Sequence, residues 1–316
     1  MFQRLSPFQR LALWTTATTY FLILVGGLVR ASGAGLGCPD WPRCFGGWVP
    51  PMSAAELPPQ FDPAQFNQTL MWTEYVNRLL GVAVGFLIFA TAISAWRHHR
   101  RDPRILWTTI GAFLLVGFQG WLGGRVVAHE LAAWIVTVHM MVALVIVQML
   151  LYVTVRAGSP SHLGSRALEH SSTPAPQHLS TFVIALIVVT LIQIAIGTQV
   201  RGGVDAALDA GVARDAALAT VGTLDVLHRD AAFITLMGSI LLSLWLVTRS
   251  GPAKAGLYIV RWSWVVLGLA VGQVALGVVM AYVSLVPAAQ VLHLTVASLL
   301  LGAETVLLLL SWRGSV

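Results

Sequence analysis

The sequence predicts an all-α membrane protein in which eight transmembrane helices form two four-helix bundles related as parallel repeats. Three observations support this fold class. The chain is unusually apolar, its apolar residues gather in eight long segments, and its polar motifs recur between the two halves. Of the 316 residues, 57% are hydrophobic and 10% are charged. A soluble domain carries about 25% charged residues, so the composition excludes an ordinary soluble domain.

The eight apolar segments are each of near-spanning length, since about 20 apolar residues cross a bilayer as a helix. They cover residues 11–29, 72–96, 105–125, 131–155, 180–200, 222–248, 258–283 and 288–312. The first exceeds the apolar core of a secretory signal peptide, about 7–15 residues, and is predicted to be a membrane span. The alternative is that the number of spans differs by one, because the turn around Pro287 between the last two segments is short.

Basic residues predict the orientation, because cytoplasmic loops carry an excess of Lys and Arg. With the N-terminus inside, twelve of the 19 basic residues lie on the cytoplasmic side and ten of the 13 acidic residues lie outside. Both termini are therefore predicted to be cytoplasmic, in a multi-pass protein. The net charge of +6 is explained as an orientation signal and does not indicate a nucleic-acid partner.

Two motifs recur between the halves and predict an internal duplication. They are Gly26-Gly27-Leu-Val-Arg30 with Gly197-Thr-Gln-Val-Arg201, and Gln119-x-x-x-Gly123 with Gln273-x-x-x-Gly277. Each half has an even number of spans, so both insert in the same direction. The predicted halves are residues 1–156 and 180–316. The Ser/Pro/His-rich stretch 157–179 is predicted to be a cytoplasmic linker in which His162, His170 and His178 are solvated.

Four polar positions follow the outer ends of the even-numbered segments by about five to eight residues. They are Asn77, His139, His228 and His293, with separations of 228−77 = 151 and 293−139 = 154. Polar side chains within a span are costly and usually functional. Two at equal depth in one four-helix bundle can hold a planar macrocycle, and neutral imidazole is a common axial ligand of haem iron. The alternative is that each histidine is a hydrogen-bonded packing residue.

The two halves differ in the ligands that they offer. His228 and His293 would give a six-coordinate iron suited to electron transfer, so a resident haem is predicted in the second half. His139 faces Asn77, and an amide is a poor iron ligand. The first half is therefore predicted to hold the reacting haem with an open iron face. Arginines near the outer span ends are predicted to bind haem propionates: Arg30, Arg78, Arg125, Arg201 and Arg229.

Glu74 and the two cysteines are further candidates. Glu74 shares a helix face with Asn77 and is predicted to act in proton transfer or to stabilise a developing cation. Its alternative is an ion pair with Arg78 four residues later. Cys38 and Cys44 lie in the first outer loop, where an oxidising exterior favours a disulfide, with thiol redox chemistry as the alternative.

Glu304 lies three helical turns deeper than His293 on the same helix face. It is either a proton-pathway residue or a carboxylic acid kept neutral by burial, and the sequence leaves both open.

Four stretches together resemble the haem A synthase family, in its bacterial branch with a cysteine pair in the first outer loop. They are Gly26-Gly-Leu-Val-Arg30, Gly35-Leu-Gly-Cys38-Pro-Asp-Trp-Pro-Arg-Cys44, Glu74-Tyr-Val-Asn77-Arg78 and Leu227-His228-Arg229. The resemblance covers all eight segments. It implies an oxidoreductase that converts the C8 methyl of haem O to the formyl group of haem A, for terminal oxidase assembly. It also implies a haem b cofactor in the C-terminal half.

Carried over by resemblance, His228 and His293 ligate haem b, His139 contacts the substrate haem, and Glu74 matches the catalytic acidic position. Asn77 departs from the family, which usually has His there, and this puts bis-histidine ligation of the substrate haem in doubt. The implied partners are the haem O synthase that donates the substrate, the oxidase assembly machinery and membrane lipid; a homo-oligomer is left open. The implied location is the bacterial inner membrane.

Two other function classes stay open at this point. One is a non-catalytic haem protein, either a membrane cytochrome b or a haem carrier. The other is a transporter built on parallel repeats, which would not bind haem in stoichiometric amounts.

Overall fold

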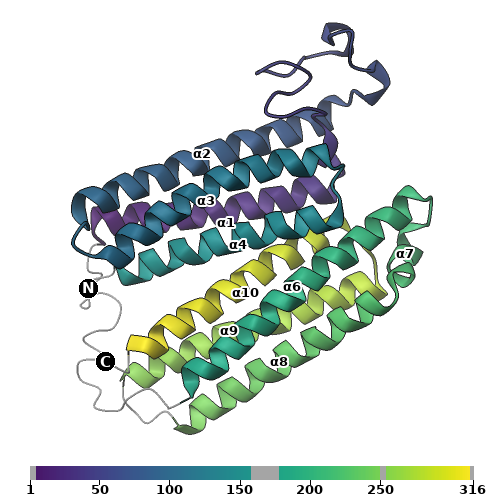
Figure 1. The fold of residues 1–316 in the computed structure, drawn as a ribbon. Coiled ribbons are helices and arrows are strands. Elements are labelled where there is room, and N and C mark those ends of the chain that lie inside the picture. Colours follow the sequence, from purple (N-terminus) through teal and green to yellow (C-terminus); the bar gives the residue numbers. More distant parts are fainter. Residues whose placement is uncertain (1–4, 158–177, 250–253, 314–316) are drawn as a thin grey trace.

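The structure, a computed structural model, describes residues 5–157, 178–249 and 254–313. Within these ranges it contains nine α-helices and no strand, and eight of the helices are long and apolar enough to cross a membrane (Figure 1). The long helices are α1 (Pro7–Ala31), α2 (Gln68–His98), α3 (Pro103–Ala128), α4 (Ala133–Arg156), α6 (Leu179–Asp209), α8 (Thr223–Arg249), α9 (Lys254–Tyr282) and α10 (Pro287–Arg313). The predicted all-α fold with eight spans is confirmed.

Local sequence signals explain where several of these helices begin. The Ser6 hydroxyl accepts a hydrogen bond from the Gln9 backbone N–H at 3.1 Å, and the Gln9 side chain accepts one from the Ser6 N–H at 3.0 Å. This capping box satisfies two backbone donors at the start of α1. α10 begins at Pro287, because proline lacks a backbone N–H and suits the first helical turn. The boundary around Pro287 that the sequence left least distinct is therefore a true helix start.

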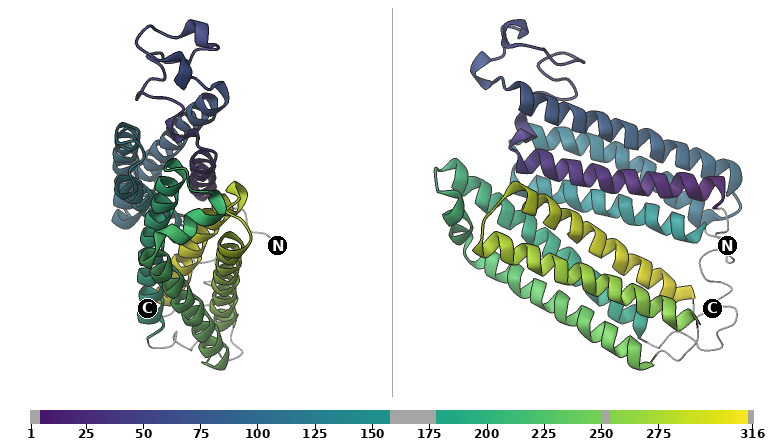
Figure 2. Two further views of the ribbon diagram at one scale, coloured as in Figure 1. Left: turned by 90° about the vertical axis from the view of Figure 1, so that its right-hand side faces the viewer. Right: turned by 180° about the vertical axis from the view of Figure 1, so that it is seen from behind.

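Within each half, the four long helices pack side by side in a ring. The neighbours are α1–α2, α2–α3, α3–α4 and α4–α1 in the first half, and α6–α8, α8–α9, α9–α10 and α10–α6 in the second (Figures 1 and 2). Helices α2 and α4 consequently face each other across one ring, and α8 and α10 face each other across the other. The facing helices carry the four polar positions.

The two rings meet through α1 with α10, α4 with α6, and α4 with α10. Exchanging α1 for α6 and α4 for α10 maps this set of contacts onto itself, so the rings are related by an approximate twofold axis. Small residues allow the close approach. A Cβ added at Gly27 would lie 3.0 Å from Leu294 Cδ2, and one added at Gly202 would collide with Ala133 Cβ.

The outer connections differ from each other and, in part, from expectation. The first, between α1 and α2, contains the short 3₁₀ helices η1 (Ala34–Leu36), η2 (Ala54–Glu56) and η3 (Pro63–Gln65), and projects beyond the end of α2 (Figure 1). The second was expected to be a loop over 202–221. Instead α6 continues to Asp209, and α7 (Arg214–Ala217) and η4 (Leu218–Val221) follow.

Composition explains this difference. The stretch after Gly203 is rich in Ala and Leu, which are strong helix formers, and α6 stops only where Gly211 adopts a φ of +83°. Hydrogen bonds from the Gly211 N–H to the Leu208 carbonyl (3.0 Å) and from the Val212 N–H to the Ala207 carbonyl (2.9 Å) close this helix end.

α1 begins and α10 ends at the same end of the bundle (Figure 1). His178 is exposed directly before α6, as expected for a solvated residue. Most of the predicted linker, including His162 and His170, lies outside the described residues. The predicted cytoplasmic orientation of the termini stays a prediction.

Candidate haem-binding sites

The structure brings two of the predicted ligands together in the second half. His228 on α8 and His293 on α10 face each other across the ring, with ring centroids 6.2 Å apart. A metal–imidazole bond is about 2.0–2.1 Å long and the nitrogen lies about 1.2 Å from the ring centre, so two imidazoles on opposite sides of one metal have centres about 6.5 Å apart. The observed spacing fits axial ligation of one iron.

Each of these rings lies against a glycine of a neighbouring helix. A Cβ added at Gly197 would stand 2.8 Å from His228 Cε1, and one added at Gly277 would stand 3.7 Å from His293 Cε1. His228 Nδ1 lies 3.2 Å from the Gln193 carbonyl oxygen, four residues before Gly197. We call a glycine together with the carbonyl four residues before it an imidazole cradle. Because a carbonyl only accepts, His228 Nδ1 carries the hydrogen and Nε2 keeps its lone pair for a metal.

The Gln193 side chain is itself held in place. The Thr235 hydroxyl of α8 donates a hydrogen bond to Gln193 Oε1 at 2.9 Å, and both side chains are buried. The cradle of His228 is therefore tied to the helix that carries His228. Gln193 and Thr235 were not among the predicted site residues; the Gln-x-x-x-Gly spacing noted at Gln119 and Gln273, which Gln193 and Gly197 share, was the signal for the cradle.

The first half contains one cradle of the same form. A Cβ added at Gly123 would stand 3.5 Å from His139 Cε1, and Gln119, four residues earlier, donates its side-chain N–H to the His139 carbonyl at 2.9 Å. His139 Nδ1 and Asn77 Oδ1 are buried, and within the described residues neither has a hydrogen-bond partner. In the part of the chain that the structure describes, an unpartnered Nδ1 occurs also at His293 in the second half, so the feature particular to this site is the buried Asn77 Oδ1, an acceptor that a bound group could satisfy.

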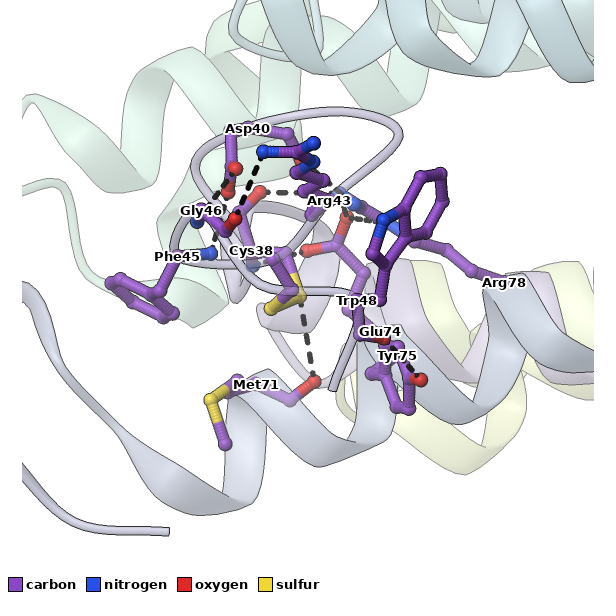
Figure 3. The surroundings of a disulfide bond; sticks show 11 residues. Cys38, Asp40, Arg43, Phe45, Gly46, Trp48, Met71, Glu74, Tyr75 and Arg78 are labelled. Atoms are coloured by element: carbon purple, nitrogen blue, oxygen red, sulfur yellow. Dashed lines mark hydrogen bonds and ion pairs between the residues drawn. A yellow bond between two sulfur atoms is a disulfide. The ribbon is translucent and has the colours of Figure 1, made fainter. Parts of the chain in front are cut away.

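Glu74 is buried and both of its oxygens have partners. The Cys38 backbone N–H donates to Oε2 at 2.8 Å, and Arg78 Nε donates to Oε1 at 3.1 Å (Figure 3). Arg78 Nη2 also pairs with Oε1. The ion pair with Arg78 that the sequence offered as the alternative is thus present. Whether Glu74 also acts in chemistry stays a prediction.

The other N–H groups of Arg78 form hydrogen bonds with the outer loop. Its guanidinium donates to the carbonyl oxygens of Asp40 (2.7 Å), Arg43 (2.8 Å) and Cys38 (3.2 Å), as Figure 3 shows. A haem propionate would have to displace one of these partners. In this structure Arg78 anchors the loop to α2.

The predicted disulfide between Cys38 and Cys44 is confirmed, with Cα atoms 4.8 Å apart (Figure 3). Both cysteines are buried in a cluster that includes Phe45 and Met71. The Asp40 carboxylate accepts hydrogen bonds from the backbone N–H groups of Phe45 at 2.6 Å and Gly46 at 2.9 Å. The disulfide therefore closes a well-ordered turn that sits directly on Glu74 and Arg78.

Two of the other predicted propionate ligands converge on an acid that sequence reasoning missed. Arg30 of α1 and Arg201 of α6 both pair with Asp205, at 2.8 and 2.6 Å. The two arginines occupy equivalent places in the repeats, and Asp205 joins them across the boundary between the rings. The i, i+4 spacing of Arg201 and Asp205 was visible in the sequence, but the contact with Arg30 was not.

The two remaining predicted arginines lie at helix ends. Arg229 pairs with Asp225 and donates to the Tyr282 hydroxyl at 3.1 Å. Arg125 lies in the last turn of α3 beside His129, with Nη2 and the ring Nε2 3.3 Å apart. Propionate binding by these residues stays a prediction.

Glu304 is completely buried in α10. The Thr190 hydroxyl donates to Oε1 at 2.9 Å, and among the described residues Oε2 has no hydrogen-bond partner. This arrangement distinguishes Glu304 from Glu74, Asp205 and Asp225, each of which is paired with arginine.

Comparison with known proteins places this chain in a family. The family described as cytochrome oxidase assembly protein, COX15-CtaA, matches residues 9–305. The chain belongs to this family. Eight long apolar helices and membership of COX15-CtaA identify a multi-pass bacterial membrane protein.

Several relatives of this COX15-CtaA chain carry the name heme A synthase. Those of Allorhizobium ampelinum and Rhizobium etli are 28% identical over 216 and 214 residues, each covering 61% of this chain and 55% and 54% of the relative. That of Methylorubrum populi is 32% identical over 203 residues, covering 57% of this chain and 50% of the relative. The chain spans about half the length of the curated relatives it matches.

Proposed function

We propose that this chain is a haem A synthase, an oxidoreductase that converts the C8 methyl of haem O to the formyl group of haem A. The observation that carries the proposal is the His228–His293 pair, 6.2 Å apart on glycine cradles, together with a related cradle at His139 in the first half. Membership of COX15-CtaA and the names of the relatives support it. One half holds a resident haem b, and the other presents the substrate haem.

In this proposal some residues bind the two haems and others orient the ligands. His228 and His293 hold haem b, which supplies one-electron transfer when bound. The Gln193 carbonyl fixes the His228 tautomer, and His139 holds the substrate haem on one face. Asn77 is too weak a ligand to close the other face. The same four-helix geometry therefore serves a permanent cofactor in one half and an exchangeable substrate in the other.

Glu74 stands at the outer rim of the first half. Cys38 N–H and Arg78 donate hydrogen bonds to its carboxylate, and these donors offset part of the cost of burying a charge there. An ionised carboxylate here stabilises positive charge that develops on the substrate, or takes a proton at Oε1 or Oε2. We infer that haem O synthase supplies the substrate and that the oxidase assembly machinery receives the product.

The test is formation of haem A by the protein in aerated membranes supplied with haem O and an electron donor, with dioxygen as the oxidant, followed by haem extraction and chromatographic separation. We expect a formyl-haem product, and we expect its loss in His139→Ala. A pyridine haemochrome assay should detect haem in the purified protein. A preparation that binds haem O and haem b but yields no formyl haem would refute the enzyme assignment, and a haem-free preparation would favour a transporter.

A non-catalytic cytochrome b or haem carrier is the second candidate, and one observation favours it. Both oxygens of Glu74 are engaged by the loop and by Arg78, which suits a purely structural acid. The two candidates differ in their response to Glu74→Gln. Loss of haem A formation at unchanged haem content supports the synthase. If the substitution changes neither the haem content nor the activity of the protein, the non-catalytic candidate is supported. Glu56→Gln, at an exposed glutamate of the same loop, is the matched control.

A further inference from the structure

Four cradle positions exist in the duplicated fold, and only three hold an imidazole. Gly123, Gly197 and Gly277 lie against His139, His228 and His293. The fourth position pairs Gly26 of α1 with Asn77 of α2. Gly26 is equivalent to Gly197, since an arginine follows each by four residues, and Asn77 is equivalent to His228, since an arginine follows each directly.

The space beside the fourth glycine is open. A Cβ added at Gly26 would meet no neighbouring atom of the described chain within 4 Å, whereas those at the other three cradles meet an imidazole at 2.8, 3.5 and 3.7 Å. α1 packs on α2 as α6 packs on α8, so the difference lies in the side chain and not in the helix arrangement. An asparagine is shorter than a histidine and does not reach the glycine.

The amide also carries an unused acceptor. Asn77 Oδ1 is buried, and no hydrogen-bond donor of the described residues reaches it. A buried acceptor without a donor is unfavourable, so a small group that donates to it would be stabilised there. Because the amide itself is a poor iron ligand, such a group would not compete with Asn77 for a metal.

We infer that the Gly26–Asn77 cradle binds a small neutral ligand that donates a hydrogen bond to Asn77 Oδ1 and offers a lone pair to the substrate haem. Water meets this description, and free imidazole is the probe that matches the other three cradles in size. The inference rests on the proposed function, because it requires a haem in the first half. It makes the ligand opposite His139 exchangeable, whereas the pair in the second half is fixed.

The test is an imidazole titration of the haem-loaded protein, followed by its absorption spectrum. We expect saturable conversion of one haem to the low-spin form while the haem at His228 and His293 is unchanged. Asn77→His should abolish the response, because its own ring fills the cradle. Gly26→Ala should weaken imidazole binding about tenfold or more, because a Cβ enters the space that the ring needs, while Gly85→Ala on α2 should not.

A second measurement needs no haem. Gly26→Ala should leave the thermal unfolding midpoint of the apoprotein unchanged in the native chain, and should lower it in the Asn77→His background, where Cβ and imidazole collide.

Two results overturn the inference. Two bound haems with no response to imidazole, or a response that persists in Asn77→His, would exclude the cradle as the binding site while leaving the proposed function intact. A protein that takes up haem only between His228 and His293 when haem O is supplied would refute the proposed function and this inference together.

Discussion

Gly197 and Gly277 each lie against a predicted haem-ligand histidine of the second half but differ in how closely that histidine approaches them. An added Cβ would stand 2.8 Å from His228 and 3.7 Å from His293. The first distance is shorter than a van der Waals contact and forces the ring to move, whereas the second is an ordinary contact. Ligand orientation is therefore expected to depend on Gly197 far more than on Gly277.

Gly197→Ala should accordingly lower the affinity for the resident haem by about tenfold, which corresponds to roughly 1.4 kcal/mol. The measurement is haem retained per protein after purification, together with the reduced absorption spectrum. Gly277→Ala is the matched control and should retain haem at the native level. Equal retention by the two variants would show that the cradle does not position His228.

Arg78 is the residue on which the outer loop depends. It and Glu74 form a buried pair, with side-chain exposures of 14% and 5%, and its remaining donors bind loop carbonyls. Removing one member of a buried ion pair typically costs about 3–5 kcal/mol, because the other charge is left without compensation. We expect Arg78→Ala to lower the free energy of unfolding by about this amount, measured by denaturation in detergent.

Arg43→Ala is the control for that loss. Arg43 is exposed; its guanidinium donates a long hydrogen bond of 3.4 Å to the Gly46 carbonyl and lies 5.6 Å from the centre of the Trp48 ring, while its carbonyl, which accepts from Arg78, is kept in the variant. The stability of this variant should stay within about 0.5 kcal/mol of the native protein. A small effect of Arg78→Ala would mean that the loop is held mainly by the apolar cluster around the disulfide.

At the scale of elements, Asp102 joins two helices of the first half. Its carboxylate caps α3 by accepting the Arg104 N–H at 3.1 Å, and it pairs with Arg156 at the end of α4 at 3.0 Å. Partial burial acts to raise the pKa of Asp102, but the hydrogen bonds from Arg156 and from the α3 backbone outweigh it and hold the pKa below its ordinary value.

The sign of the pH effect follows from this shift. A carboxyl group whose pKa is lower in the folded protein stabilises the fold above its unfolded pKa, near 3.9, and loses that contribution as the pH falls through the folded value. Asp102→Asn keeps a side chain that can cap α3 but removes the ion pair with Arg156, so it should lower the free energy of unfolding at pH 7 by about 0.2–1 kcal/mol, the usual range for a partly exposed pair. Unfolding curves of the two proteins should converge below about pH 4. A difference that is independent of pH would contradict this account.

The sequence was most informative about the secondary-structure elements. Long apolar segments and their flanking Pro and Arg predicted all eight spans, because composition and length decide membrane insertion locally. The extension of α6 to Asp209 was missed because loop length was judged by polarity, while helix propensity of the Ala-rich stretch decided the outcome.

For the sites, the sequence predicted which residues lie on each helix but not the contacts between different helices and loops. Repeat spacing found the histidines, their shared depth and the unusual Asn77, since these depend on position along single helices. Asp205 as a bridge and Arg78 as a loop anchor were not predictable, because each contact joins segments far apart in the chain. Helix packing and the path of the outer loop determine such contacts.

At the scale of the whole molecule, the duplicated rings have different interiors. Beneath its site the first half has an apolar cluster that includes Val84, Ile88 and Leu150. Shifted by the repeat separations of 151 and 154, these positions become Thr235, Ser239 and Glu304, all buried polar residues in the second half. Duplication therefore preserved the helix arrangement while the interiors diverged. At these three pairs of positions the polar side chains lie in the second half, beneath the predicted resident haem.

The junction between the rings supplies the last prediction. Asp205 neutralises Arg30 of one ring and Arg201 of the other, and all three side chains are partly buried. Asp205→Ala would leave two guanidinium groups close together without an acid between them. We expect it to lower the free energy of unfolding by about 1–2 kcal/mol, less than for a fully buried charge because solvent screens the cluster.

Two further variants identify the cause of that loss. Asp209→Ala, one turn later on the same exposed helix end, should change stability little. A double-mutant cycle of Asp205→Ala with Arg30→Gln should give a coupling energy of about 0.5–3 kcal/mol if Asp205 joins the rings. Additive effects would mean that Asp205 serves only its own helix through Arg201 and does not join the rings.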